Sequence, residues 1–173
     1  LSRVSDLKTN LARNHGLLEA IKRIPNSNMN QDCRIVRIRV AANLVNCDEN
    51  KPMLLENQGF LDALLRIAHL DQSDVAREFA GVALMDLASA PANQIPMAQN
   101  EKVLGTLVKI VLVEKVASAR ESAITAIQNL AFTKENRTRL VHYKEGIVLE
   151  ALRKSLSGDK NDKARRRAAG ALT

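Results

Sequence analysis

The stretch ARESAITAIQNLAF at residues 119–132 decides the fold, because copies of it recur along the chain. One copy, AREFAGVALMDLAS, occupies residues 76–89 and lies 43 residues earlier, and a shorter one, ARRRAAGALT, occupies residues 164–173. Similarity at a fixed interval of about 20 to 50 residues is the signature of a stacked-repeat solenoid, in which each unit buries its apolar face against its neighbours. The sequence therefore predicts an array of repeats that presents a surface for binding.

A second repeated segment supports the same interval. The strings GLLEAIKRI at residues 16–24 and GFLDALLRI at residues 59–67 are also 43 residues apart. Related strings occupy residues 102–110 and, after a slip of one residue, residues 146–154. Each has apolar side chains at helical spacing over about two and a half turns, so each is predicted to form the second helix of its unit.

The first helix of each unit is predicted from a short apolar patch that follows an asparagine. These asparagines, Asn50, Asn93 and Asn136, are again 43 residues apart. An asparagine before a helix can cap it by accepting a hydrogen bond from a backbone N–H, so we expect all three to be helix caps. Pro96 falls inside one of these short helices, and we expect it to shorten or bend that helix.

The third helix of each unit contains the opening stretch or one of its relatives. Such a helix has a continuous apolar face and a polar face opposite, so it packs on one side and displays the other. The prediction is an all-α solenoid of about four three-helix units in a single repeat domain, residues 1–173, whose last unit is cut off at Thr173. The expected third helices cover residues 31–46, 74–88, 117–132 and 160–173, and the expected units cover residues 1–46, 47–89, 90–132 and 133–173.

Composition narrows the classes of function. Apolar residues make up 46% of the chain and aromatic residues 2%, which fits close-packed helices built from Leu, Ile, Val and Ala, while the net charge of +7 favours acidic partners. Cys33 and Cys47 form no CxxC pair and are expected to be small buried side chains of an intracellular protein, cytoplasmic or nuclear. The longest apolar run, residues 103–113, is too short to cross a bilayer, so no membrane partner is predicted.

The sequence contains none of the common catalytic or cofactor-binding motifs. His15, His69 and His142 lie far apart and lack the spacing of a metal site. Glycine-rich phosphate loops and nucleophile motifs are also absent from the sequence. The chain is therefore predicted not to be an enzyme and to use no cofactor.

Three helices in 43 residues, with glycine opening the second and an Arg-Glu-x-Ala…Asn-Leu-Ala third helix, resemble the armadillo repeat. HEAT repeats, with two helices per unit, are the nearest alternative. The resemblance covers essentially the whole chain and implies a right-handed superhelix whose third helices line a concave groove. In armadillo proteins an asparagine near the end of the third helix commonly holds the backbone of an extended peptide, and the matching positions here are Asn43, Asp86 and Asn129.

The chain departs from the armadillo pattern at one position of this groove. In nuclear-import adaptors of the karyopherin-α type, a tryptophan four residues before that asparagine forms a slot for a lysine. This sequence has Arg39, Val82 and Thr125 there and contains no tryptophan. The resemblance therefore argues against binding of a nuclear-localisation signal, and Arg39 would repel a basic peptide. A protein segment of acidic or mixed charge is easier to accommodate.

The predicted function is a protein–protein interaction module that holds an extended segment of a partner. Asn43 and Asn129 would bind the backbone of that segment, since a carboxamide offers both a donor and an acceptor, or they would merely end their helices. Asp86 would accept from a peptide N–H or bind a basic group, or it would be an ordinary solvated acid. Side-chain selection is assigned to Arg39, Arg77, Glu121 and Thr125, with Val82 as a further groove position.

Two other functions stay open, namely an architectural spacer within a longer solenoid and a basic surface for nucleic acid. The basic series is Lys160, Lys163 and residues 165–167, but successive arginines on a helix point about 100° apart and form no single face. The scarcity of aromatic rings also disfavours nucleic acid, because single strands bind by stacking on them. Ala169 and Leu172 should pack on a following unit, so the C-terminal end is expected to fray or to self-associate.

Overall fold

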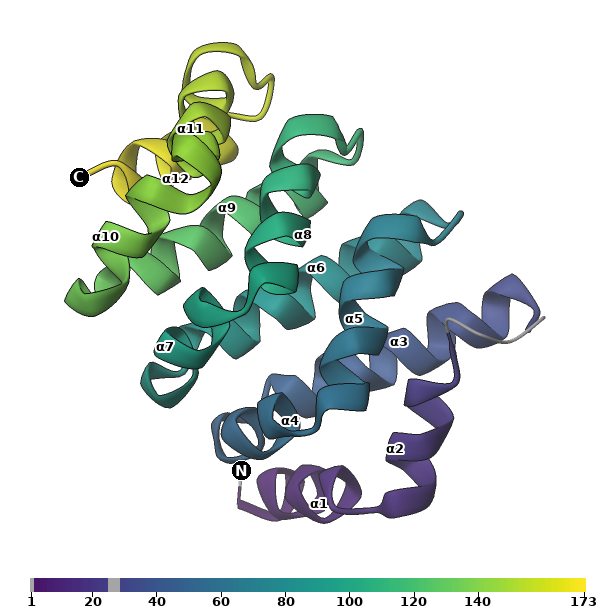
Figure 1. Cartoon of the computed structure of the whole chain (residues 1–173). Helices are drawn as coiled ribbons and strands as arrows, with labels where there is room; N and C mark the ends of the chain where they lie inside the picture. The colour runs from purple at the N-terminus through teal and green to yellow at the C-terminus, as the bar shows by residue number, and fades with distance from the viewer. Residues whose placement is uncertain (1, 25–28) are drawn as a thin grey trace.

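The chain folds as an all-α solenoid in which four groups of three helices stack side by side (Figure 1). The computed structural model describes residues 2–24 and 29–173, and these residues contain no strand. The predicted array of about four three-helix repeats is confirmed. The helices are α1 (Ser2–Ala12), α2 (His15–Lys22), α3 (Gln31–Val45), α4 (Lys51–Glu56), α5 (Gln58–Leu70), α6 (Asp74–Ser89), α7 (Pro91–Gln99), α8 (Glu101–Val113), α9 (Ala117–Phe132), α10 (Lys134–His142), α11 (Ile147–Gly158) and α12 (Asp162–Ala171), with short 3-10 turns η2 (Asp48–Asn50) and η3 (Tyr143–Gly146).

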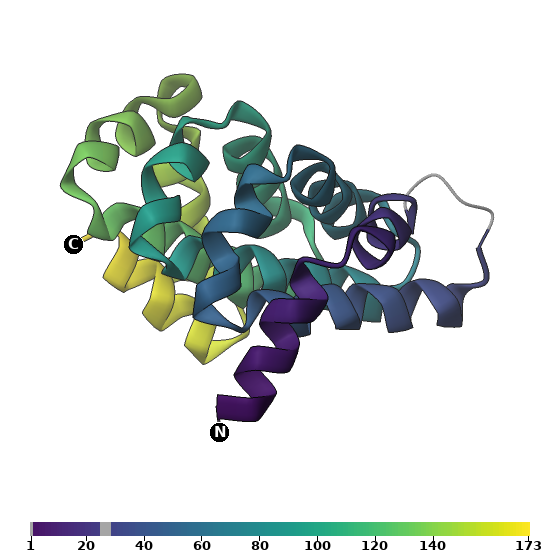
Figure 2. The same ribbon diagram turned by 90° about the horizontal axis from the view of Figure 1, so that it is seen from below.

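The third helices α3, α6, α9 and α12 form one layer of the right-handed superhelix, and the second helices α2, α5, α8 and α11 form another (Figure 2). Neighbouring third helices pack directly on one another because small side chains lie between them. Ala80, Ala83, Ala123 and Ala126 are all 0% exposed and let the helix backbones approach closely. The apolar core is therefore continuous from one unit to the next.

Asparagine side chains cap the second helices of the first three units. Asn14, Asn57 and Asn100 each precede a second helix, and the Oδ1 of each accepts from a backbone N–H of the first turn. Caps of this kind stabilise a helix by about 1 kcal/mol. The bonds run from Leu17 N at 2.9 Å, from Phe60 N at 3.2 Å, and from Val103 N at 3.3 Å.

Asn50, Asn93 and Asn136 do not cap helices, so that prediction is wrong. Their side chains are buried, and each Nδ2 donates two hydrogen bonds to backbone carbonyls. One carbonyl ends the preceding third helix, and the other belongs to the first helix of the preceding unit. We call this arrangement the asparagine clasp. Its pairs are Asn50 with Leu44 (2.9 Å) and Lys8 (3.3 Å), Asn93 with Leu87 and Lys51 (both 3.0 Å), and Asn136 with Leu130 (2.9 Å) and Gln94 (3.0 Å).

A second periodic contact joins each third helix to the next unit. An arginine in its first turn donates to a carboxylate that follows the next second helix, and the carboxylates are almost fully buried. We call these contacts the arginine–carboxylate ladder. A buried ion pair is costly to break, because removal of one partner leaves an uncompensated charge. The Nε–O distances are 3.0 Å for Arg34–Asp71, 2.7 Å for Arg77–Glu114 and 2.7 Å for Arg120–Asp159.

The last unit accommodates its additional residue at the corner between α10 and α11. Lys144, Glu145 and Gly146 have φ angles of 42°, 62° and 90° and so form a left-handed turn. Tyr143 holds the start of this corner, since its side chain is buried and its Oη donates to the carbonyl of Glu101 at 3.1 Å. The slip of one residue in the sequence is therefore absorbed in a turn and does not displace the helices that follow.

Two local expectations are corrected by the structure. Helix α7 continues through Pro96 and has 9 residues, the same as α10, which lacks a proline, so Pro96 does not shorten its helix. Cys47 is buried as expected, but Cys33 is exposed on α3, and the two cysteines are not joined by a disulfide.

Candidate functional site

The side chains predicted to bind a ligand lie mainly on the outward side of three consecutive third helices. We call this surface the third-helix face. It repeats from unit to unit because α3, α6 and α9 are parallel members of one layer (Figure 2). Its residues are Arg39 and Asn43 on α3, Glu78, Val82 and Asp86 on α6, and Glu121, Thr125 and Asn129 on α9.

The two asparagines of the face are not equivalent. Asn43 is exposed and has no hydrogen-bond partner within residues 2–24 and 29–173. Asn129 is half-buried, and its Nδ2 lies 3.4 Å from the backbone oxygen of Met85 on the neighbouring third helix. No described group donates to the Oδ1 of Asn129. Asn43 can therefore offer both a donor and an acceptor to a ligand, whereas Asn129 offers its oxygen most readily.

Asp86 stands between these asparagines in the row and is half-buried. Burial raises the pKa of Asp86, and the charge of Asp48 adds to this shift, although Lys51 and a hydrogen bond from the Asn46 side chain oppose it. An approaching cation would favour the ionised form of this carboxyl group. Asp86 is therefore suited to a basic group of a ligand.

Two further carboxylates lie on the same part of the face. Glu78 and Glu121 occupy equivalent positions on α6 and α9, 43 residues apart. Glu78 is without a hydrogen-bond or ion-pair partner in the described part of the chain, and Glu121 accepts a weak bond of 3.4 Å from Asn161 Nδ2. Thr125 is half-buried and donates to the backbone oxygen of Glu121 at 2.8 Å. The α6–α9 part of the face is thus acidic, while the α3 part carries the exposed cation Arg39.

Glu78 belongs to the repeated stretch but was not among the site residues predicted from the sequence. Its alignment with Glu121 was the signal that could have identified it, because both occupy the fourth position after the start of their helices.

Arg77, which was predicted to select side chains of a ligand, does not lie on the third-helix face. Its side chain is only 15% exposed and donates to Glu114 at 2.7 Å and to the backbone oxygen of Asp71 at 2.7 Å. It belongs to the arginine–carboxylate ladder and does not face a ligand. Arg165 of the basic series is also paired, although outside the ladder, because its guanidinium donates to the backbone oxygen of Asp159 and to the carboxylate of Asp162, while Arg166 and Arg167 are exposed.

The C-terminal end of the array carries an apolar hollow of about 270 Å³. Phe132, 66% exposed, and Val141 line it together with Leu172, the residue after α12. Fraying or self-association at this end stays a prediction.

The described residues provide neither a set of metal ligands nor a helix able to span a membrane. Nowhere in them do three His, Cys, Asp or Glu side chains lie together as a set of metal ligands. His142 Nδ1 lies 2.8 Å from the Thr138 oxygen in its own helix, and His15 is exposed. None of the described helices combines the length and the apolar character that a bilayer-spanning segment needs.

The architecture matches solved structures of designed repeat proteins. A designed armadillo repeat protein in complex with the peptide (KR)4 superposes with a TM-score of 0.79 at 22% identity, over 97% of this chain and 67% of that chain. The chain has an armadillo-type repeat fold. A computationally designed armadillo protein for modular peptide recognition gives the same TM-score at 24% identity, over 97% of this chain and 68% of the other, and an engineered protein gives 0.70 at 18% identity, over 91% and 37%.

The armadillo resemblance seen in the sequence is thus confirmed at the level of the fold. No protein-family model matches the chain, and no curated protein is similar to it in sequence. Of the two designed armadillo proteins, one was solved with a bound peptide and the other was designed for modular peptide recognition.

Proposed function

We propose that this protein is a non-catalytic interaction module that binds an extended segment of a partner protein along the third-helix face. The observation that carries the proposal is the row Asn43, Asp86 and Asn129, which puts one polar side chain per unit on parallel helices. Packed helices lie about 8 to 10 Å apart, which corresponds to two or three residues of an extended chain. One unit can therefore contact every second or third residue of a bound segment.

The charge of the face indicates a segment of mixed charge. Glu78, Asp86 and Glu121 would attract a basic side chain over α6 and α9, while Arg39 would attract an acidic one over α3. A uniformly basic peptide would meet repulsion from Arg39, and a uniformly acidic one would meet three carboxylates. This proposal keeps the mixed-charge partner expected from the sequence and adds the order of the charges along the face.

Regular rows of polar side chains favour binding over the spacer alternative, because a spacer needs no alignment of polar groups from unit to unit. The nucleic-acid alternative lacks a row of rings to stack bases on, since Phe60 and Tyr143 are buried and the exposed Phe132 stands alone at the C-terminal end of the described array. An intracellular location, cytoplasmic or nuclear, stays a prediction from the composition.

The proposal is tested by fluorescence anisotropy with labelled peptides of mixed charge. The probes are DDSGKRKR, its reversed sequence, and (KR)4, the peptide bound by the designed armadillo protein. We expect one of the two mixed peptides to bind more tightly than (KR)4. The double substitution Asn43→Ala and Asn129→Ala should weaken that complex by about tenfold, because two backbone hydrogen bonds of about 0.5 to 1.5 kcal/mol each are lost.

The control is Asn10→Ala, which removes an exposed asparagine from α1, a helix that is not part of the third-helix face. It should leave the affinity unchanged. Unchanged affinity in the Asn43 and Asn129 double variant would rule out the backbone-binding mechanism.

The pH dependence of binding tests the position of the basic group. Because burial raises the pKa of Asp86, this carboxyl group ionises at a higher pH than an exposed Asp does, and a cationic ligand favours its ionised form. The affinity for the mixed peptide should therefore rise as the pH increases through this raised pKa. Asp86→Asn should flatten this rise, and an identical pH profile in Asp86→Asn would show that no cation binds there.

A further inference from the structure

We propose that the segment bound by the third-helix face carries its charges in the order acid, base, acid, an inference that rests on the proposed function of that face. The observation behind it is that α12 continues the face into the fourth unit and adds cations to it. Lys163 and Arg166 supply these cations, and both side chains are exposed. One acidic end of the segment would therefore lie over α12 and the other over α3.

Helical position places Arg166 on the third-helix face. It lies four residues after the start of α12, the position that Glu121 holds in α9. Ala164 and Ala168 pack into the core and are both 0% exposed, and Arg166 is two residues from each. Two residues correspond to a rotation of about 200°, so Arg166 points away from the core. Lys163, three residues before Arg166, lies on the same side of the helix.

The two cations of α12 have no partner within residues 2–24 and 29–173. No hydrogen bond or ion pair joins the side chain of Lys163 or Arg166 to another described group. Asp162, the acid in the first turn of this helix, already pairs with Arg165. Glu121 forms no ion pair with Arg166, although the two occupy the same position of neighbouring helices. An acidic group of a ligand can therefore bind these cations without displacing a native partner.

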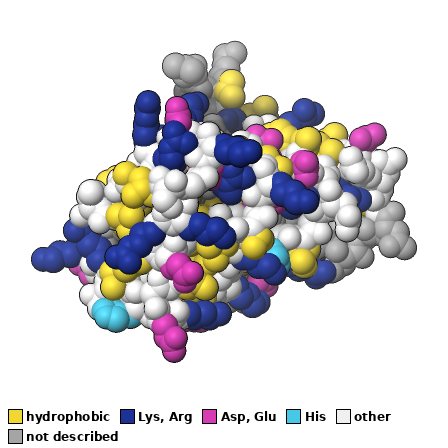
Figure 3. All heavy atoms as spheres, turned by 90° about the horizontal axis from the view of Figure 1, so that it is seen from above, with side chains coloured by type: hydrophobic (Ala, Val, Ile, Leu, Met, Phe, Trp, Pro, Cys, Tyr) yellow, Lys and Arg dark blue, Asp and Glu magenta, His cyan; other side chains and the backbone are white. Residues whose placement is uncertain are grey.

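The surroundings of α12 are basic. Residues 160–173 contain five cations and one acid. Figure 3 views the molecule from above, the side on which the third helices begin, and shows Lys and Arg side chains across it with fewer Asp and Glu side chains. This surplus of positive charge favours an acidic group of a ligand over α12.

The centre of the face has the opposite charge. Glu78 on α6 and Glu121 on α9 occupy the same position of neighbouring helices, so their carboxylates repel one another. Asp86 adds a third carboxylate on α6. A basic group of a ligand placed between α6 and α9 would relieve this repulsion.

The α3 end of the face is again cationic. Arg39 is exposed, and its side chain has no partner in the described part of the chain. Asp32, the acid of α3, lies seven residues away, which is about 10 Å along the helix. Arg39 can therefore take the second acidic group of the segment, with a single cation where α12 offers two.

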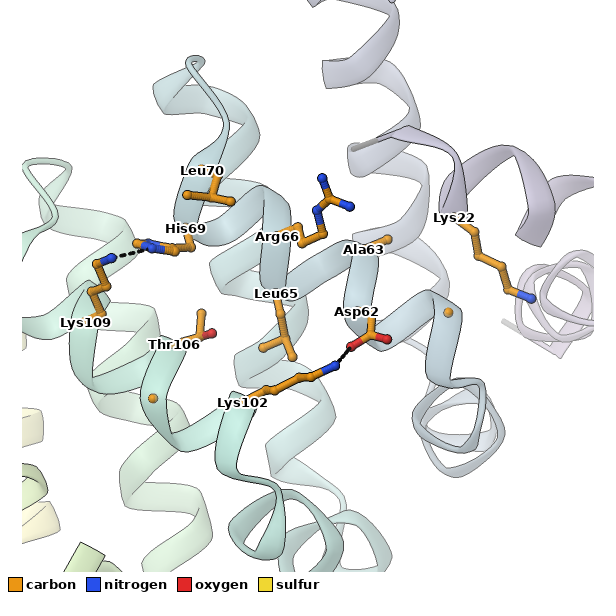
Figure 4. A pocket seen from close by; sticks show the side chains of 12 residues that line it. Lys22, Asp62, Ala63, Leu65, Arg66, His69, Leu70, Lys102, Thr106 and Lys109 are labelled. Atoms are coloured by element: carbon orange, nitrogen blue, oxygen red, sulfur yellow. Dashed lines mark hydrogen bonds and ion pairs between the residues drawn. The ribbon is translucent and has the colours of Figure 1, made fainter. Parts of the chain in front are cut away.

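The second helices carry cations as well, but these are engaged. In the groove of about 660 Å³ between α5 and α8, Lys102 Nζ lies 3.1 Å from Asp62, and Lys109 Nζ lies 2.6 Å from His69 Nε2 (Figure 4). Arg66 on α5 also has an interaction partner. An acidic group would have to compete with these contacts in the groove, whereas it meets unpaired cations at the two ends of the third-helix face.

The spacing of the third helices sets the length of the segment. Helices packed about 8 to 10 Å apart put α3 and α12 roughly 24 to 30 Å apart. An extended chain rises about 3.3 Å per residue, so about eight to ten residues connect the two ends. A segment of this length can hold acids at both ends and bases in the middle, where it crosses α6 and α9.

The test compares two peptides of identical composition, DDGKRKRGDD and KRGDDDDGKR, by fluorescence anisotropy on the whole chain. Each peptide has the same order of charges when read in either direction, so the direction of binding does not affect the comparison. We expect DDGKRKRGDD to bind about tenfold more tightly, because every block of the other peptide meets like charge on the face.

Variants of α12 test the position of the acidic end. Lys163→Gln combined with Arg166→Gln should weaken binding of DDGKRKRGDD by about fivefold, and Arg39→Gln should weaken it by about twofold to threefold. The matched control is Arg153→Gln combined with Lys154→Gln, which removes two exposed cations from α11 in the same unit and should leave the affinity unchanged.

A peptide without acids separates a role in binding from a role in folding. SSGKRKRGSS should bind the Lys163 and Arg166 double variant at least as tightly as the wild type, because two repelling cations are gone. Weaker binding of both SSGKRKRGSS and DDGKRKRGDD to this variant would show that the two residues serve the fold, and would overturn their assignment to the ligand.

Other outcomes would also overturn the proposal. These are equal affinity for the two peptides of identical composition, and equal loss in the α12 and α11 double variants. If the Asn43 and Asn129 double variant still weakened binding in that case, the proposed function would stand and only the order of charges would fail. If it did not, both would fail. A single-stranded oligonucleotide that displaced DDGKRKRGDD from the wild type would assign the cations of α12 to a nucleic acid instead.

Discussion

Two rows of side chains follow the same interval of 43 residues but differ in burial and in hydrogen bonding. Asn50, Asn93 and Asn136 are buried, and their amide groups bind carbonyls of the preceding unit. Asn43 and Asn129 lie on the surface of the third helices, where the amide of Asn43 has no partner in the described residues. In this solenoid, the 43-residue interval identifies both sets of asparagines. Burial and hydrogen bonding then distinguish the asparagines that join neighbouring units from the asparagines that can bind a ligand.

The arginine–carboxylate ladder should show the largest effect on stability. Arg120→Met leaves Asp159, whose side chain is 4% exposed, without its charge partner, and should lower the free energy of unfolding by about 3 to 5 kcal/mol. Urea unfolding followed by circular dichroism measures it. Adding Asp159→Leu should restore much of the loss, and a single variant as stable as the wild type would contradict the importance of the ladder.

The same pair predicts a pH dependence. The hydrogen bond from Arg120 lowers the pKa of Asp159 in the folded state. A lowered carboxyl pKa contributes stability above the unfolded-state value of about 3.9, and this contribution is lost as the pH falls through the folded-state pKa. The difference in stability between the wild type and the Arg120→Met, Asp159→Leu variant should therefore shrink in acid.

The asparagine clasp should show the next largest effect. Asn93→Ala removes both donors from the buried carbonyls of Leu87 and Lys51, and should lower the free energy of unfolding by about 2 to 4 kcal/mol. Asn93→Asp, which keeps the size but removes the donor, should be at least as harmful. If Asn93→Ala were tolerated without loss in urea unfolding, the clasp would not contribute to the stacking of units.

Caps of the second helices should have a smaller effect than either contact between units. Asn100→Ala removes the acceptor for the backbone N–H groups of Lys102 and Val103, and should cost about 1 kcal/mol. Asn100→Ser should recover most of it, because serine also caps helices. Thermal unfolding of the wild type, Asn100→Ala and Asn100→Ser measures these differences. If Asn100→Ala lost as much stability as Asn93→Ala, the capping asparagines could not be distinguished from the asparagines that join units.

The exposed row should have the smallest effect on stability. Asn43→Ala should change the free energy of unfolding by less than about 0.5 kcal/mol, because its side chain has no partner in the described residues to lose. Its effect should appear only in peptide binding. A large loss of stability in this variant would show that Asn43 serves the fold as Asn93 does.

The sequence was sufficient to place the helices because the interval recurs in apolar side chains that must all face a neighbouring unit. The expected third helix at residues 117–132 coincides with α9, and the one at residues 31–46 differs from α3 by a single residue. Sequence reasoning chose the wrong asparagines as caps because Asn93 and Asn136 lie inside the first turns of α7 and α10, three residues past the cap residues Ala90 and Thr133. Such a shift is invisible without the hydrogen bonds.

The candidate site was harder to predict than the fold. Arg77 and Glu121 belong to the same repeated motif, yet Arg77 is paired within the ladder while Glu121 lies on the surface. The acidic partners of the ladder arginines lie in loops and vary between Asp and Glu, so they form no recognisable motif, although Asp71 and Glu114 are 43 residues apart.

The left-handed corner formed by Lys144, Glu145 and Gly146 shows where this architecture can change length. Upstream of it, Asn136 retains both of its carbonyl partners, and downstream Asp159 retains Arg120. A gene can thus gain or lose a codon at this bend without breaking the contacts on either side. The same bend would be a permissive place to introduce a tag or a reactive handle while the third-helix face stays intact.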